Sequence, residues 1–323
     1  RISIAGIGIL LGGGVITTEK VISSKIASRV EQQLPNASGI SASIPLLDIP
    51  SDLNSDEIKA VQINIEEYLL KGSGTKSSLA ISAKNISKSN PRVGLIALAS
   101  DFMIEKDFIN IIKDREIDFF VNRIECYNPL TKENLIKMSN KVTEVTKDIL
   151  PDQDIDCVVY GCTSGTIAAG YNSIEQKVKA AKPTADVTTP STAAIKALKK
   201  LNINKICLFT PYSKKLNDEV LDYFKNEGFE ITSNSYFDIE ADYDIGKVDQ
   251  NYLYKVLSEI DLNGAEALFV SCTALPVLPI IDKLEKNLNI PVLSSNQALI
   301  WDTLVKINKN NSIEGFGKLF QAN

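Results

Sequence analysis

Two of the five cysteines in this 323-residue chain occupy matching positions that indicate thiol chemistry. Cys162 follows the apolar run 157–161 and precedes a segment that can form a helix, and Cys272 follows the apolar run 267–270. Each has a small residue before it and a threonine after it. A strand, a tight turn and a helix N-terminus are expected, and the unpaired amides of such a turn lower the pKa of a thiol. The repetition predicts two thiols that face one cleft.

A pair of opposed thiols can perform two kinds of reaction on a small carboxylate. One thiol can remove a proton beside the carboxylate while the other supplies one, or a thiolate can add to an activated alkene. The alternative for Cys162 and Cys272 is that both are buried core residues without a role. Cys126, Cys157 and Cys207 lie within or beside apolar runs and are expected to be packing residues.

The composition excludes several classes of protein. The chain has no histidine, which excludes Ser-His-Asp and Cys-His catalysis and argues against a structural zinc site. Its net charge of −5, without a basic cluster, argues against binding of nucleic acid. The odd number and wide spacing of the cysteines do not fit a disulfide framework, so the part that carries them is expected in the cytoplasm. We expect neither a cofactor nor a metal.

Repeated strand–helix units from residue 91 onward are expected to position the cysteines. Strands are predicted at 93–100, 117–124, 157–162, 185–189, 205–210, 230–237, 267–272 and 291–295. Helices are predicted at 102–114, 131–149, 166–181, 191–201, 213–227, 250–260, 275–288 and 298–307. This alternation predicts an α/β fold with parallel sheets covered on both faces. The repeated Cys-Thr segment further predicts two pseudo-symmetric lobes that meet at Thr189-Pro190, with the site beyond the strand carboxyl ends.

Residues 1–90 have a different pattern, and its interpretation stays open. The apolar, glycine-rich run 1–16 suits a signal or a membrane anchor, with a buried strand and turn as the alternative. Residues 17–90 combine an amphipathic helix at 17–34 with strand-like segments. This small α+β region resembles the LmeA-like (DUF2993) phospholipid-binding family, which implies contact with lipid or membrane. A small accessory sheet is the alternative.

Motifs along residues 91–323 resemble the aspartate/glutamate racemase superfamily, within its maleate isomerase and arylmalonate decarboxylase branch. Besides the two cysteine turns, they are the segments 93–101, 189–190, 211–212, 294–298 and 314–319. The phrases Tyr-Gly-Cys-Thr-Ser-Gly-Thr and Leu-Ser-Ser-Asn-Gln-Ala are most similar to the ectoine-utilisation subgroup. The resemblance implies a two-lobed, cofactor-independent isomerase or racemase of small carboxylates, and we expect it to form a homo-oligomer.

The same resemblance implies roles for individual residues. Cys162 would be the nucleophile or first base, and Cys272 the opposing acid or base. The decarboxylase branch keeps only the second cysteine, so Cys162 argues against decarboxylation. Tyr212 matches the tyrosine with which this family contacts substrate, and a turn tyrosine with an exposed hydroxyl is the alternative.

Polar groups around the cysteine turns are expected to bind the substrate. Turn amides and the hydroxyls of Thr163, Ser164 and Thr273 would hold its carboxylates. Asp101 stands where the isomerase pattern has asparagine, and Asp242 is aligned with a second family asparagine. An aspartate would repel a dicarboxylate unless protonated but would bind an ammonium group, so an aminocarboxylate such as an ectoine-derived diamino acid is preferred. The alternative for Asp101 is a cap on the following helix.

Three functions are consistent with the sequence. The preferred one is a cofactor-independent isomerase or racemase that acts on a small aminocarboxylate through Cys162 and Cys272. The second is maleate cis–trans isomerisation itself. The third is a membrane-associated lipid-binding protein whose racemase-like domain is not catalytic.

Overall fold

The computed structural model describes residues 90–322, and the structural statements below concern that part of the chain. The predicted anchor or signal at 1–16 and the predicted lipid-binding region that follows it lie outside the described residues. Within residues 90–322, no helix is both long and apolar enough to cross a membrane.

The first four strands form a parallel sheet in the order β2-β1-β3-β4. β1 spans Arg92–Leu98, β2 Asp118–Ile124, β3 Cys157–Gly161 and β4 Asp186–Thr188. β3 is buried throughout, and β1 is buried after its first residue. Strands buried on both faces need apolar side chains at every position, which is why both appear in the sequence as continuous apolar runs.

The next four strands repeat this arrangement in a second parallel sheet, in the order β6-β5-β7-β8. β5 spans Lys205–Tyr212, β6 Glu230–Ile239, β7 Ala267–Val270 and β8 Val292–Ser294. We call each sheet with its helices a lobe. The third strand of each lobe leads into one of the two cysteine turns. The predicted α/β fold with two pseudo-symmetric parallel-sheet lobes is therefore confirmed.

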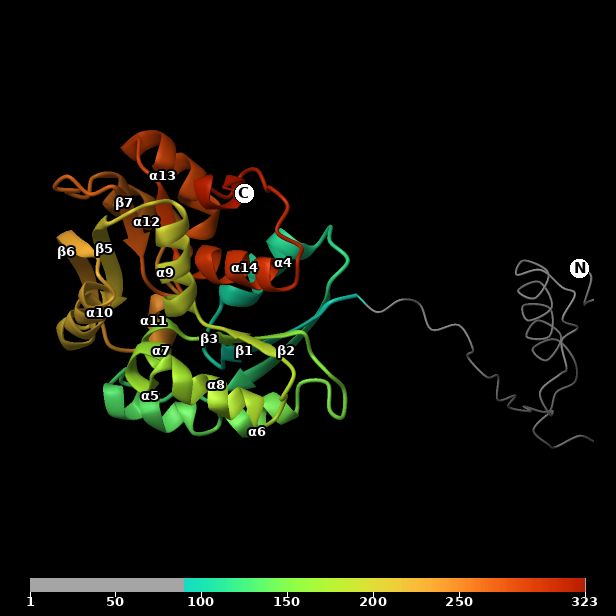
Figure 1. Cartoon of the computed structure of the whole chain (residues 1–323). Helices are drawn as coiled ribbons and strands as arrows, with labels where there is room; N and C mark the ends of the chain where they lie inside the picture. The colour runs from blue at the N-terminus through green and yellow to red at the C-terminus, as the bar shows by residue number, and fades with distance from the viewer. Residues whose placement is uncertain (1–89, 323) are drawn as a thin grey trace, which may run out of the picture. The chain divides into compact units, whose positions relative to one another are not determined.

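Helices follow most strands and cover the sheets (Figure 1). In the first lobe they are α4 Ile104–Ile112, α5 Lys132–Ser139, α6 Val142–Lys147, α7 Thr163–Ala169, α8 Tyr171–Lys179 and α9 Pro190–Lys200. The second half of the chain contains α10 Lys214–Asn226, α11 Asp242–Ile245, α12 Gln250–Ser258, α13 Ile281–Leu288, α14 Ser295–Lys306 and the 3₁₀ helices η1 Leu278–Ile280 and η2 Lys318–Gln321.

All eight predicted strands are confirmed, but two predicted helices are each divided in the structure. The helix predicted at 166–181 begins earlier, at Thr163, and breaks at Gly170. Gly170 has a φ of 80°, which a residue with a side chain rarely adopts. The helix predicted at 131–149 divides into α5 and α6. The sequence pattern does not predict α11, which is only one turn long.

Helix α14 joins the two lobes. It begins where β8 ends, yet it contacts β3, β4 and α4 of the first lobe and lies beside α9 (Figure 1). The six residues from Ser295 to Ile300 are all buried. A helix surrounded by protein in this way has no solvent-facing side along that stretch, so polar groups there must find partners inside the molecule.

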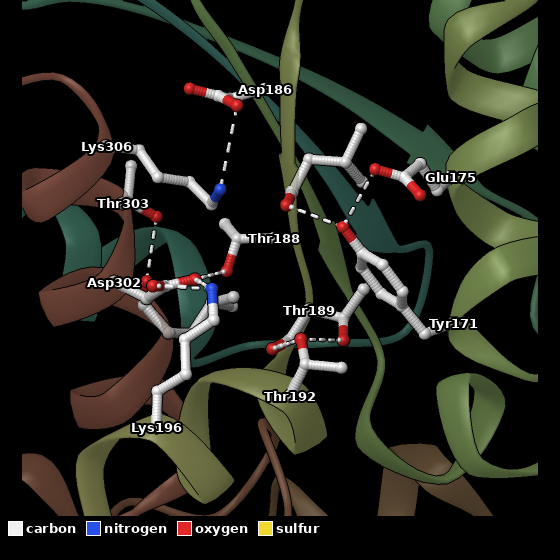
Figure 2. A network of polar contacts seen from close by, with 12 residues as sticks. Tyr171, Glu175, Asp186, Thr188, Thr189, Thr192, Lys196, Asp302, Thr303 and Lys306 are labelled. Carbon is white, nitrogen blue, oxygen red and sulfur yellow. Dashed lines mark hydrogen bonds and ion pairs between the residues drawn. The ribbon is translucent and has the colours of Figure 1, made fainter. Parts of the chain in front are cut away.

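A buried carboxylate fixes the later part of α14 to the first lobe (Figure 2). Asp302 accepts a hydrogen bond of 2.5 Å from the Thr188 hydroxyl at the end of β4. The Lys196 Nζ of α9 lies 2.9 Å from both carboxylate oxygens of Asp302. The Asp302 side chain is 4% exposed and that of Lys196 is 48% exposed. The lysine is thus the solvent-facing partner of a carboxylate that is removed from water.

Lys196→Met is expected to destabilise the fold, because it leaves the buried Asp302 carboxylate without its cationic partner. The expected loss in the free energy of unfolding is about 1–3 kcal/mol. Urea unfolding of the variant and of Lys199→Met, an exposed lysine on the same helix, measures it. An equal effect of the two substitutions would show that the ion pair with Asp302 does not stabilise the fold.

Candidate active site

Cys162 lies between β3 and α7 and caps the helix with its sulfur. Its Sγ accepts a hydrogen bond from the Gly165 amide at 3.2 Å and lies 3.9 Å from the Ser164 Oγ. A thiol here takes the place of the serine, threonine or aspartate that usually begins a helix. A Cβ on residue 165 would come within 2.8 Å of both Cys162 Sγ and Tyr160 Oη. Gly165 is therefore needed for the sulfur to occupy the turn.

Burial raises the pKa of the Cys162 thiol well above its usual range, and the neighbouring Cys126 and Asp242 add to the rise. The Gly165 amide and the Ser164 hydroxyl lower it by less. The predicted decrease in the pKa of Cys162 is therefore wrong in this structure, because the thiol is only 2% exposed. The turn amides are in place, but a thiolate requires that water or a polar ligand reach the sulfur.

Cys272 lies just after β7 and is 3% exposed. Its Sγ accepts a hydrogen bond from the Ala274 amide at 3.4 Å. No α-helix begins at this turn, because the chain reaches η1 only at Leu278. Burial raises the pKa of Cys272, the charge of Asp242 raises it further, and the Tyr212 hydroxyl and the Ala274 amide lower it.

Tyr212, the last residue of β5, has a pKa that both thiols influence. Burial raises its pKa well above the usual range, and both Cys272 and Cys162 raise it further, while Ser164 lowers it. The side chain is 2% exposed, so the alternative of an exposed turn tyrosine is wrong. We call Cys162, Ser164, Tyr212 and Cys272 the thiol cluster. It brings residues from the strand ends of both lobes together, and in this structure it is buried rather than open to a cleft.

Asp101 contributes one carboxylate oxygen to α4, and its other carboxylate oxygen, Oδ2, is buried without a hydrogen-bond partner in the described part of the chain. Its Oδ1 accepts hydrogen bonds from the amides of Met103 at 2.7 Å and Ile104 at 3.0 Å, which confirms the capping alternative. Burial raises the pKa of Asp101, and the two amides, the Thr273 side chain and Arg123 oppose that rise.

Asp242, the first residue of α11, reaches from the second lobe to the first. Its Oδ2 accepts a hydrogen bond of 2.5 Å from the Ser100 hydroxyl, and its amide donates to Asn128 Oδ1 at 2.9 Å. Burial raises the pKa of Asp242 to about 6, the Ser100 hydroxyl lowers it, and the charge of Asp101 raises it. The structure therefore brings the two predicted aspartates together beside the thiol cluster.

Cys126 also lies in this region, although the sequence indicated a packing residue. It is half-buried just after β2. Burial raises its pKa to about 12, Asp242 and Asp101 raise it, and the Ser100 hydroxyl lowers it. Since β2 and β1 are neighbours in the sheet, their carboxyl ends lie together. The five cysteines contain no disulfide, and no group of three or more Cys, Asp or Glu side chains in the described part of the chain could hold a metal ion.

The predicted substrate-binding threonines make contacts within the protein. The Thr163 hydroxyl donates to Ser295 Oγ at 2.9 Å, and the Thr273 hydroxyl donates to the Gly161 carbonyl at 3.4 Å. A hydroxyl that donates its proton in this way cannot donate it to a substrate carboxylate at the same time. Their predicted role in substrate binding stays a prediction.

The sequence did not identify two polar residues that support the Cys272 turn. The Asn296 amide group donates to Asp107 Oδ2 at 2.8 Å and to the Thr273 carbonyl at 2.7 Å. Burial raises the pKa of Asp107 to about 7, Asn296 lowers it, and Asp101 raises it. The sequence contained one signal of a buried carboxyl at Asp107. This residue is three positions after Ile104 and therefore lies on the apolar face of α4.

Known proteins are similar to this chain in sequence and fold. A sequence model of the arylmalonate decarboxylase family matches residues 120–320. Maleate isomerase from Geobacillus stearothermophilus is 26% identical over 246 residues, which cover 72% of this chain and 97% of that protein. Neither match supports the resemblance of residues 17–90 to a phospholipid-binding family.

Two solved structures show the same fold. A cysteine-to-alanine variant of maleate isomerase Iso from Pseudomonas putida S16, solved with maleate, is 24% identical with a TM-score of 0.64. The alignment covers 72% of this chain and 98% of that one. A mutant of the Nocardia farcinica maleate cis-trans isomerase is 21% identical with a TM-score of 0.67, and covers 72% of this chain and 99% of its own. The Nocardia structure contains a covalently bound succinylcysteine intermediate.

The raised pKa of Asp107 predicts a pH dependence of stability. The folded protein keeps this proton up to about pH 7, whereas the unfolded chain releases it near 3.8. Between these values the Asp107 contribution to the free energy of unfolding should fall by about 1.4 kcal/mol for each unit of rising pH. Urea unfolding of wild type and Asp107→Asn is measured from pH 4.5 to 8, at pH values about one unit apart. The quantity compared is the difference between their free energies of unfolding at each pH. A difference that does not change with pH would contradict the raised pKa.

Proposed function

Because the chain belongs to the arylmalonate decarboxylase family, within the aspartate/glutamate racemase superfamily, we propose that it is a cofactor-independent isomerase or racemase of a small aminocarboxylate. That it is an enzyme of the isomerase class rests on its maleate isomerase relatives, which align over nearly their whole length. What supports the thiol mechanism is that Cys162 and Cys272, which follow the third strands of the two lobes, both influence the pKa of Tyr212.

In the racemase form of the reaction, the two thiols exchange one proton each with the substrate. A Cys162 thiolate takes the proton from the carbon beside the carboxylate, and the electron pair of that bond is delocalised into the carboxylate. The Cys272 thiol then donates its proton to the opposite face of the carbon. The raised pKa keeps the Cys272 thiol protonated near neutral pH, as a proton donor requires. The pKa of Cys162 is raised as well, so Cys162 would have to lose its proton when the substrate binds. The Gly165 amide stabilises the thiolate at Cys162.

The amino group of the proposed substrate follows from the charge around the thiol cluster. The charges of Asp242 and Asp101 both act on Cys272, so a cation bound to them would lie beside the thiols. The nearby Arg123 guanidinium pairs with Glu105 and donates to the carbonyls of Leu98 and Asp101. The Asp101 Oδ2, which has no hydrogen-bond partner among residues 90–322, therefore suits an ammonium group, which would also favour the thiolate form of Cys162.

Maleate cis–trans isomerisation is the second candidate, and the names of the relatives favour it. In that reaction the Cys162 thiolate would add to one alkene carbon while a proton is added to the other, and rotation about the resulting single bond would precede elimination. Maleate carries two carboxylates, so Asp101 and Asp242 would have to be protonated or displaced. Ectoine-derived diamino acids are one candidate within the preferred class. The lipid-binding function gains no support from the relatives.

Substitution of the two cysteines tests the thiol mechanism. Cys162→Ala and Cys272→Ala should each lower kcat/KM by on the order of a thousandfold, because each removes a proton-transfer group or nucleophile. Cys157→Ala is the matched control, since it removes a buried thiol from β3 outside the thiol cluster. Turnover measured on maleate and on a panel of aminocarboxylates decides the outcome. Wild-type activity in either cluster variant would exclude a reaction that needs both thiols.

Asp101→Asn separates the two substrate classes. Asparagine keeps the oxygen that caps α4 and replaces the unpartnered Oδ2 by an amide nitrogen, so only the charge toward the substrate is lost. Loss of a charge-assisted bond to a substrate ammonium should cost about 2–5 kcal/mol in transition-state stabilisation, whereas turnover of maleate should stay constant or increase. Asp101→Ala is the control for the cap. An equal loss on maleate and on aminocarboxylates with Asp101→Asn would exclude an ammonium-binding role.

A further inference from the structure

The first two residues of α14 contact both cysteine turns. Ser295 accepts the hydrogen bond of 2.9 Å from Thr163, which directly follows Cys162. Asn296 donates the hydrogen bond of 2.7 Å to the carbonyl of Thr273, which directly follows Cys272. The two turns belong to different lobes, yet their neighbours are held by consecutive residues of one helix.

The end of the helix that makes these contacts is itself fixed. Ser294 caps α14 by accepting a hydrogen bond from the Gln297 amide at 3.1 Å. Asp107 accepts the other hydrogen bond of the Asn296 amide group and so orients it from α4. Ser295 and Asn296 are 0% and 1% exposed, so solvent does not compete for these bonds. A short rigid segment with buried partners is suited to hold two loops at a constant separation.

The Asn296 side chain also shows which of its atoms the position requires. Its Oδ1 is buried and has no hydrogen-bond partner among residues 90–322, while its Nδ2 makes two hydrogen bonds. A buried unsatisfied oxygen destabilises a fold, so an amide here is explained by its donor group and not by general packing.

We propose that Ser295 and Asn296 are positioning residues that set the separation of the Cys162 and Cys272 thiols, with Asp107 orienting Asn296. The catalytic consequence rests on the proposed function, in which both sulfurs must reach one carbon atom. Neither residue needs to touch the substrate. Each acts through the residue that follows a cysteine.

Four variants and one matched control test this role. Ser295→Ala and Asn296→Ala each remove the contact to one cysteine turn, and Asn296→Ala also removes the bond to Asp107. Asp107→Leu removes the acceptor that orients Asn296. Asp107→Asn keeps an acceptor and should restore the wild-type behaviour. The control is Thr303→Val, which removes a buried hydroxyl bonded to the Leu299 carbonyl within the same helix but away from both turns. If Asn296→Ala does not fold, the comparison of Asp107→Leu with Asp107→Asn still tests the role of Asn296.

Two measurements are made on each variant and compared with its urea unfolding. The first is the rate of iodoacetamide labelling of each cysteine, read by peptide mass spectrometry, which does not depend on turnover. Ser295→Ala should change the labelling rate of Cys162 selectively, and Asn296→Ala that of Cys272. The second is steady-state kinetics, in which kcat should fall by about tenfold or more while KM stays nearly constant, as expected for misplaced reacting groups.

The outcomes separate this inference from the proposed function. If labelling and kcat change only in proportion to stability, as in Thr303→Val, Ser295 and Asn296 are ordinary structural residues and the inference fails. If wild type turns over neither maleate nor any aminocarboxylate, the proposed function fails. The labelling rates would still confirm or exclude the positioning of the two turns.

Discussion

The carboxyl ends of the two parallel sheets are buried against each other, and this burial constrains every polar group at the site. Most donors and acceptors that are removed from water are satisfied by the protein, and two of the partners here come from the opposite lobe. Thr163 bonds to Ser295, and Ser100 bonds to Asp242. The two lobes are therefore held together by the same residues that surround the thiols, so the stability of the lobe contact and the geometry of the site have a common origin.

Burial also determines the protonation of the site. It is the largest influence on the pKa of both cluster cysteines, and it raises the pKa of Asp107 to about 7 and that of Asp242 to about 6. Thiols and carboxyls have widely different pKa values in water, but here burial favours the neutral, protonated form of both. A substrate that brings a cation into this space would reverse the bias, since it stabilises the thiolate and the carboxylates together. The charge of the substrate would then control when the thiol becomes reactive.

The sequence predicted the fold well because the strands that form the sheet interiors, such as β1 and β3, are continuous apolar runs. It predicted the site less well, for two physical reasons. Cys126 follows β2 in the first lobe and Asp242 begins α11 after β6 of the second, and the sequence does not show how the two lobes pack, so the closeness of Cys126 to Asp242 was not visible. The pKa of Cys162 depends on how deeply the whole fold buries it, and local turn geometry contains no information on that.

Helix α14 shows how the fold and the site depend on each other. Its first turn contacts both cysteine turns through Ser295 and Asn296, while Asp302, two turns later, is bonded to Thr188 and Lys196 in the first lobe. Because a helix is stiff over this length, a shift at Asp302 would be transmitted to the residues beside the thiols. The polar network at Asp302 is therefore more than a local ion pair. It fixes the later part of the helix whose first turn contacts both cysteine turns.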